Sequence, residues 1–122
     1  MNRGLVLFAH GARDRQWGAP LRDLAQRIAT LNPDLSVRIA FLEIELPTLT
    51  DAVAELSPAC TQIDILPVFW APAGHVNNEL PELVDACRAA HPQIAFNMLP
   101  TLSELPGLLD FVAHQAIALA GR

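Results

Sequence analysis

The chain has 122 residues, a length that suits one compact domain over residues 1–122, and its formal net charge is −5. All eight cationic residues are arginines, which excludes lysine Schiff-base chemistry and a P-loop lysine. The arginines form no dense cluster, so the sequence does not predict a nucleic-acid partner. Apolar residues make up 52%, a surplus that predicts strands buried on both faces, a subunit interface, or both.

Strand-like and helix-like segments alternate four times along the chain. A buried strand is expected over residues 3–9, followed by a helix that Pro20 opens and Asn32 ends. A second strand is expected over 36–43, and the helix after it stops at Ser57. The inner faces of the two helices are apolar stripes, formed by Leu21, Leu24, Ala25, Ile28 and Leu31 in the first and by Leu49, Val53 and Leu56 in the second.

The second half of the chain repeats this alternation. A third strand is expected over residues 62–70, and Asn77 or Asn78 is expected to cap the helix that follows it. A weaker strand spans 94–99, since Asn97 interrupts its apolar run. The final helix carries an apolar series of residues, namely Leu108, Leu109, Val112, Ala116 and Leu119.

Strands separated by helices pair in parallel through right-handed crossovers. The predicted fold is therefore an α/β three-layer sandwich, with a four-stranded parallel sheet of order 2-1-3-4 flanked by helices. This order would bring the carboxyl ends of the first and third strands together at the point where the topology reverses, which is where open α/β folds place their ligands.

Targeting and redox signals are weak. The apolar run before His10 is too short for the core of a signal peptide, and no stretch approaches the ~18 residues of a membrane span, so we expect a cytoplasmic protein with no membrane partner. Cys60 and Cys87 lack the paired spacing of a zinc or dithiol motif, and we expect them to be small buried hydrophobic residues.

Three apolar runs each lead into a group that can bind metal or move protons. His10 follows the first run, Glu43 follows the second, and His75 follows the third after a short turn. The alternative for His10 is a core histidine, and for His75 it is a solvated loop histidine. For Glu43 it is a strand end that simply meets solvent, with Glu45 two residues on. Imidazole and carboxylate are suitable ligands for Zn, Fe, Co or Ni, and both accept protons near neutral pH.

Other catalytic classes lack their signatures. The chain has neither the HExxH spacing of a helix-borne zinc site nor a GxSxG elbow. A receiver module would need clustered acids after the first strand and a late lysine, and a flavodoxin would need a Ser/Thr-rich phosphate loop. None of these features is present.

Four segments together resemble a known family. They are LVLFAHGAR at 5–13, FLE at 41–43, LPVFWAPAGHVNNELPELV at 66–84 and LPTLSELPGLLDFV at 99–112. The chain resembles the sirohydrochlorin chelatases of the CbiX/SirB type over nearly its whole length, in their short, single-lobed form. The resemblance implies ATP-independent insertion of a divalent metal into sirohydrochlorin, in cobalamin or siroheme-type biosynthesis. It implies cobalt first, with nickel or iron as alternatives, and no organic cofactor.

The resemblance also implies roles for individual residues. His10 and His75 would hold the metal, and Glu43 would take protons from the macrocycle as the metal enters. Arg13 is a candidate contact for the substrate carboxylates, and Ala12 and Gly74 are expected in the substrate-binding turns. Many relatives read HGSR and GGHV, so that Ala12 lacks their hydroxyl and Ala73 replaces their first glycine.

Longer relatives of this type carry two such lobes around a cleft. The short form therefore implies a homodimer, in which Phe111 and Leu119 of the final helix could serve the interface. Trp17 and Trp70 could pack against the macrocycle, although core or interface packing is the alternative for each. A protein that binds and delivers metal or tetrapyrrole without catalysis would use the same ligands, so it remains the competing function.

Overall fold

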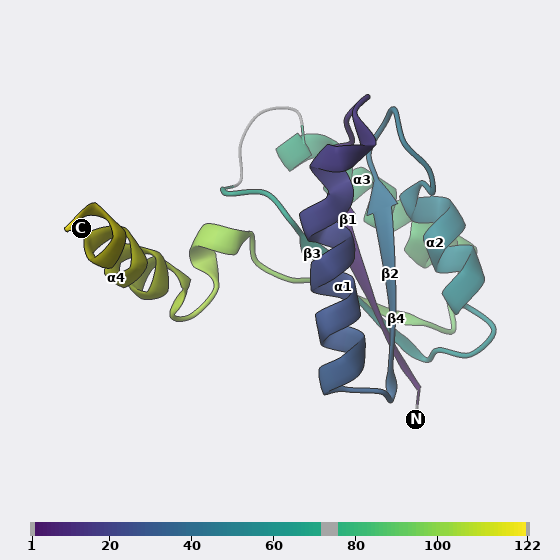
Figure 1. The fold of residues 1–122 in the computed structure, drawn as a ribbon. Coiled ribbons are helices and arrows are strands. Elements are labelled where there is room, and N and C mark those ends of the chain that lie inside the picture. The colour runs from purple at the N-terminus through teal and green to yellow at the C-terminus, as the bar shows by residue number, and fades with distance from the viewer. Residues whose placement is uncertain (1, 72–75, 122) are drawn as a thin grey trace.

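A computed structural model describes residues 2–71 and 76–121 (Figure 1). These residues form a four-stranded parallel sheet of order β2-β1-β3-β4. The strands are β1 (Arg3–Ala9), β2 (Leu35–Phe41), β3 (Gln62–Pro67) and β4 (Ala95–Met98). The predicted fold class and strand order are confirmed.

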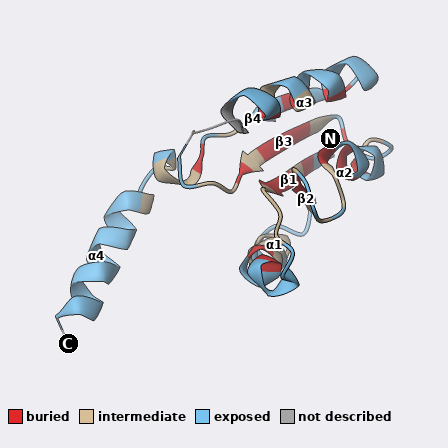
Figure 2. Ribbon diagram, turned by 90° about the horizontal axis from the view of Figure 1, so that it is seen from above, coloured by how far each residue is buried: buried red, intermediate tan, exposed pale blue. Residues whose placement is uncertain are grey.

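Helices cover both faces of the sheet. The four α-helices are α1 (Ala19–Leu31), α2 (Leu49–Leu56), α3 (Val76–Ala90) and α4 (Leu108–Ala120), and the 3-10 turns are η1 (Arg15–Gly18) and η2 (Leu102–Glu104). Figure 2 shows α1 on one side of the sheet and α2 and α3 on the other. We call the sheet with α1, α2 and α3 the lobe. Among the described residues, no helix is long and apolar enough to cross a membrane.

Several boundaries differ from those predicted. β2 ends at Phe41, before Glu43, and β3 ends at Pro67, before residue 70. Val68 still donates its N–H to the carbonyl of Phe8 in β1. Because β1 ends at Ala9, the residues after Val68 have no β1 residue to pair with. α3 begins at Val76, which places Asn77 and Asn78 inside the first turn of the helix and not at its cap.

The start of α2 is marked by a capping box, which the apolar pattern of the sequence does not include. The side chain of Thr48 accepts a hydrogen bond from the backbone N–H of Asp51, and the Asp51 carboxylate accepts one from the N–H of Thr48. This reciprocal capping box satisfies two backbone donors at the helix start. The capping box fixes the start of α2, so the loop that carries Glu43 ends at Thr48.

The core fills both sides of the central strand. Val6, Leu7 and Phe8 are each 0% exposed: Leu7 packs toward α1, and Val6 and Phe8 pack toward α2 and α3. Each such side chain contributes about 1.5–3 kcal/mol to folding. One explanation of the apolar surplus, strands buried on both faces, therefore holds for β1.

Both cysteines belong to the core, as the sequence predicted. Cys60 and Cys87 are 5% and 4% exposed. Burial raises the pKa of each thiol, and Arg38 offsets part of this rise at Cys60. A raised pKa keeps a cysteine in its neutral, weakly reactive form, so a packing role fits both residues.

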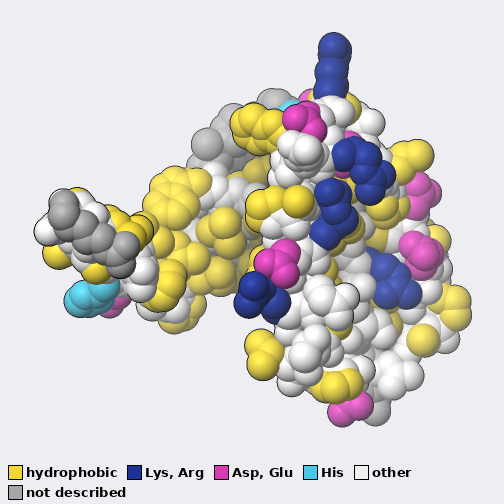
Figure 3. Space-filling view, in the orientation of Figure 1, with side chains coloured by type: hydrophobic (Ala, Val, Ile, Leu, Met, Phe, Trp, Pro, Cys, Tyr) yellow, Lys and Arg dark blue, Asp and Glu magenta, His cyan; other side chains and the backbone are white. Residues whose placement is uncertain are grey.

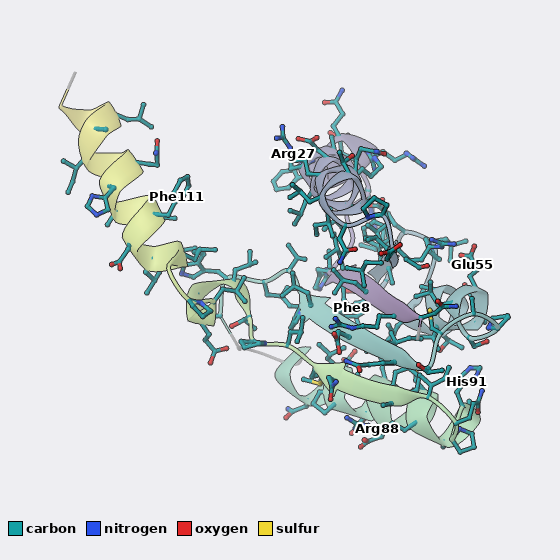
Figure 4. The ribbon with its side chains drawn as sticks, turned by 90° about the horizontal axis from the view of Figure 1, so that it is seen from below. Phe8, Arg27, Glu55, Arg88, His91 and Phe111 are labelled. Carbon is teal, nitrogen blue, oxygen red and sulfur yellow. The ribbon has the colours of Figure 1, made fainter. Side chains whose placement is uncertain are left out.

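α4 departs from the expected arrangement. A helix after the fourth strand of such a sheet normally packs on the sheet, but α4 extends away from the lobe (Figures 1 and 2). None of its residues is buried. Figure 3 shows hydrophobic side chains along this helix and on the segment that joins it to the lobe, and Figure 4 shows Phe111 of α4 far from Phe8 of the core.

Candidate functional site

The candidate site lies at the carboxyl ends of β1 and β2. The chain leaves β1 at Ala9 and β2 at Phe41, and the two exits stay paired beyond the strands. Leu42 donates its N–H to the carbonyl of Ala9 at 2.9 Å, and Glu43 donates its N–H to the carbonyl of His10 at 3.1 Å. The sheet ladder thus continues for two residues and places Glu43 beside His10.

The side chains of His10 and Glu43 meet across these two exits. His10 Nε2 lies 3.3 Å from Glu43 Oε1, and His10 Nδ1 lies 3.4 Å from the carbonyl oxygen of Gly11. Both side chains are about half exposed, at 43% for His10 and 55% for Glu43. The tautomer of the imidazole decides which ring nitrogen donates, so Nε2 can either donate a hydrogen bond to the carboxylate or offer a lone pair to a metal ion.

This separation suits two ligands of one ion. A divalent first-row metal with bonds of about 2.1 Å to N and O, at angles near 90–110°, holds neighbouring ligand atoms roughly 3.0–3.4 Å apart. His10 Nε2 and Glu43 Oε1 lie within that range at 3.3 Å. The pair can therefore bind one metal ion, or pass a proton from one partner to the other, without rearrangement of the backbone.

Gly11 makes the close approach of the two exits feasible. Its φ is +103°, and a Cβ built at this position would overlap the carbonyl oxygen of Glu43. Only glycine adopts this conformation at low cost and leaves room for the neighbouring backbone. The glycine after His10 therefore serves both the turn and the contact between the two loops.

A pocket of about 370 Å³ adjoins the pair on the side of α1. It is lined by apolar residues of the sheet and α1, and by five residues of the β1 exit and η1: His10, Gly11, Ala12, Trp17 and Gly18. Trp17 is 78% exposed, so the expected alternative of core packing is wrong for this residue. Its ring is an exposed aromatic surface at the mouth of the pocket.

Glu45 is a site residue that the sequence pattern did not select. It lines the pocket, and its Oε1 accepts a hydrogen bond from the N–H of Ala12 at 2.9 Å. This bond ties the loop after β2 to the loop after β1 a second time. The E-x-E spacing of Glu43 and Glu45 was the available signal, and it could not say which carboxylate pairs with the histidine.

The other predicted site residues divide into two groups. Ala12 lines the pocket, and Arg13 is exposed next to it; within the described part of the chain Arg13 has no ion pair. Gly74 and His75 lie outside the described residues. In residues 2–71 and 76–121 no group of three His, Cys, Asp or Glu side chains could hold a metal ion, so His75 stays a prediction as the third member of the set.

The fold and the site together define a class: a parallel α/β lobe with a histidine and a glutamate paired at the carboxyl edge of its sheet. The chain belongs to the CbiX family, whose model matches residues 4–118. The resemblance noted in the sequence is thereby confirmed at the level of the family.

Named relatives match fewer residues of the chain than the family model does. The chain is 30% identical over 82 residues to a sirohydrochlorin cobaltochelatase of Methanococcoides burtonii, and 29% identical over 82 residues to one of Methanosarcina acetivorans. Each match covers 66% of this chain and 63% of the relative. The chain thus spans less than two thirds of the relatives that it matches.

Solved structures share the fold at lower identity. A cobalamin (vitamin B12) biosynthesis CbiX protein of Marinobacter aquaeolei VT8 superposes with a TM-score of 0.81 at 20% identity, over 97% of this chain and 96% of that chain. The sirohydrochlorin chelatase SirB of Bacillus subtilis subspecies spizizenii, solved with cobalt, superposes with a TM-score of 0.81 at 18% identity. That match covers 98% of this chain but 52% of the SirB chain.

Proposed function

We propose that this chain inserts a divalent metal ion into sirohydrochlorin, with cobalt as the first candidate and nickel or iron as alternatives. The observation that carries the proposal is the separation of 3.3 Å between His10 Nε2 and Glu43 Oε1 beside an open pocket. Membership of the CbiX family and the names of the relatives support the same substrate. The metal is a substrate here, and no organic cofactor takes part.

The chemistry requires a metal ligand and a base on one side of the macrocycle. Two pyrrole N–H protons must leave as the metal enters, so the free base and the divalent ion give the metallated ring and two protons. We assign His10 to the incoming ion and Glu43 to the first proton, which passes from the pyrrole nitrogen to the carboxylate. His75, as the second imidazole, would complete the metal set, and metal binding requires both imidazoles to be neutral.

The pocket alone does not enclose a tetrapyrrole. A volume of about 370 Å³ lies near the lower end of the ~300–1,000 Å³ usual for small-molecule sites, and sirohydrochlorin extends beyond it with its ring of carboxylates. Arg13 is placed to contact one of these carboxylates, and a guanidinium can bind it through two parallel hydrogen bonds. A homodimer would close the other side of the macrocycle, and the SirB chain, about twice the length covered here, supports two facing lobes.

Trp17 is expected to stack on the macrocycle at the mouth of the pocket. Replacing it with alanine should raise the Kd for metal-free sirohydrochlorin about tenfold, which corresponds to about 1.4 kcal/mol, because an aromatic contact is lost. Trp17→Phe should keep most of the affinity. Titration followed by the absorbance of the tetrapyrrole measures both constants. Equal affinity of Trp17→Ala and the wild type would remove Trp17 from the substrate site.

The function is tested by an anaerobic absorbance assay. Sirohydrochlorin is mixed with Co²⁺, Ni²⁺ or Fe²⁺ in turn, with and without the protein. We expect metallation faster than the spontaneous rate, and fastest with cobalt. If the protein binds the tetrapyrrole but leaves the spontaneous rate unchanged, the chain is a binding or delivery protein and the enzymatic assignment is wrong.

A further inference from the structure

The residue after Glu43 has an unusual backbone conformation. Ile44 has a φ of +72°, and within residues 2–71 and 76–121 it is the one residue other than glycine with a positive φ. This left-handed region is costly for residues with a Cβ, and a β-branched residue there is a genuine outlier. Glycine and asparagine adopt the conformation at lower cost. The isoleucine therefore makes the free protein less stable than it could be.

Hydrogen bonds impose this conformation on Ile44. The N–H of Glu45 donates to the carbonyl of Glu43 at 2.8 Å, which closes a three-residue γ-turn with Ile44 at its centre. A γ-turn with a positive φ at the central residue is rare and strained. On one side of the turn, the N–H of Glu43 donates to the carbonyl of His10 at 3.1 Å. On the other side, Glu45 Oε1 accepts from the N–H of Ala12 at 2.9 Å. The bonds that place Glu43 beside His10 thus also hold the strained turn.

The lobe gains no core packing from the Ile44 side chain. The residue is 60% exposed, and neither of the two core clusters formed by the described residues includes it. Leu42, two residues earlier, does pack against the core. Strained residues persist where the surrounding structure imposes them, and they cluster at ligand sites. The site needs the turn, but the fold does not need an isoleucine at its centre.

Exposed apolar side chains flank the polar pair at this edge of the sheet. Ile44 follows Glu43 in the chain, and Trp17 lines the pocket together with His10; both apolar side chains are largely exposed. Figure 3 shows hydrophobic, acidic and histidine side chains next to one another at the upper end of the lobe. A tetrapyrrole has the matching pattern, because its nitrogens lie at the centre of a flat carbon framework. Side chains beside a metal-binding pair would therefore meet that framework.

We propose that Ile44 is a substrate-contacting residue, whose side chain packs on the flat face of the tetrapyrrole while Glu43 faces the pyrrole nitrogens. In the free protein the side chain lies in water and the backbone of Ile44 is strained. In the complex, the apolar surface that leaves water offsets this cost. The inference rests on the proposed function, because it takes the ligand to be a flat tetrapyrrole.

Ile44→Asn tests the contact, because asparagine accepts a positive φ but offers no apolar side chain. We expect a higher midpoint of urea unfolding with an unchanged slope, since strain is relieved and no core contact is lost. We also expect the Kd for metal-free sirohydrochlorin to rise about tenfold, because an apolar contact with the ring is lost. Titration followed by the absorbance of the tetrapyrrole measures this constant.

Two control variants and one control ligand accompany this test. Ile44→Val keeps a β-branched apolar side chain, so its unfolding midpoint and its Kd should stay close to those of the wild type. Leu31→Asn replaces a leucine of α1 that is 85% exposed, and it should leave the Kd unchanged. Calorimetry with Co²⁺ alone should give the same affinity for Ile44→Asn as for the wild type, because the side chain of Ile44 does not hold the ion.

Several outcomes would overturn the proposal. Ile44→Asn contradicts it if the variant binds sirohydrochlorin as tightly as the wild type, or if it is less stable, since the side chain would then pack within its own lobe. An equal loss of Co²⁺ affinity also contradicts it, because Ile44 would then act through the position of Glu43. A change of mass in light scattering would show that the side chain packs on another chain.

The same measurements separate this inference from the proposed function. If the wild type binds no sirohydrochlorin, both are wrong. If Ile44→Asn binds the tetrapyrrole more weakly but the wild type does not speed up metallation, the contact is supported and only the insertion reaction is contradicted. If the wild type metallates sirohydrochlorin and Ile44→Asn binds it with unchanged affinity, the function stands and the contact is wrong.

Discussion

Replacing His10 with alanine should lower the proposed rate of cobalt insertion by about a hundredfold or more, while the protein stays folded. The imidazole would supply a ligand to the incoming ion, and it also lies 3.3 Å from the carboxylate assigned to the first proton. Removal of one proton-transfer group alone costs about 10²–10⁴ in rate. The measurement is the initial rate of the anaerobic absorbance assay, with Co²⁺ affinity determined separately by calorimetry.

Two further variants separate the roles. Glu43→Gln keeps the shape of the side chain but removes the base, so it should lower the rate with a smaller loss of cobalt affinity than His10→Ala. His91→Ala, at the carboxyl end of α3, is the matched control and should keep full activity. An unchanged rate in His10→Ala, with folding retained, would show that the pair is not the metal site.

Gly11→Ala should destabilise the protein by about 2–4 kcal/mol, and it should reduce the proposed activity together with stability. A non-glycine residue at a φ of +103° carries a conformational cost, and the added Cβ would also overlap the Glu43 carbonyl oxygen. To relieve the overlap the two loops must move apart, which separates His10 from Glu43. Urea unfolding monitored by circular dichroism gives the change in free energy.

Gly107 provides a control in which only the conformational cost applies. Its φ is +84°, but a Cβ there meets nothing within 4 Å. Gly107→Ala should therefore cost about 1 kcal/mol. Similar losses of stability in the two variants would show that the contact between Gly11 and Glu43 contributes nothing beyond the backbone conformation.

The β2 exit shows how far the sequence pattern extends. The pattern predicted that Glu43 would follow the second strand, and the residue does lie beside His10. It did not predict that β2 ends two residues earlier, because the last ladder bonds are made by Leu42 and Glu43 in a bend. The hydrogen bond from the N–H of Ala12 to Glu45 depends on that bend, so the apolar pattern of the sequence could not predict it.

The sequence by itself determined the order of elements, the parallel sheet and the residues at the carboxyl ends of its strands. These follow from local features: apolar runs of strand length, glycine where the chain turns, and alternation of strand with helix, which permits little besides parallel pairing. The same features carried the resemblance to the CbiX family, which the match over residues 4–118 confirms.

Only the tertiary structure decided which side chains meet and which helix stays uncovered. The distance between His10 and Glu43 depends on the register of β1 with β2, a contact between segments more than thirty residues apart. The apolar residues of α4 look the same in the sequence whether they pack on their own sheet or on another chain. Local patterning specifies that a surface is apolar, and the path of the chain after β4 determines whether that surface finds its partner within the same molecule.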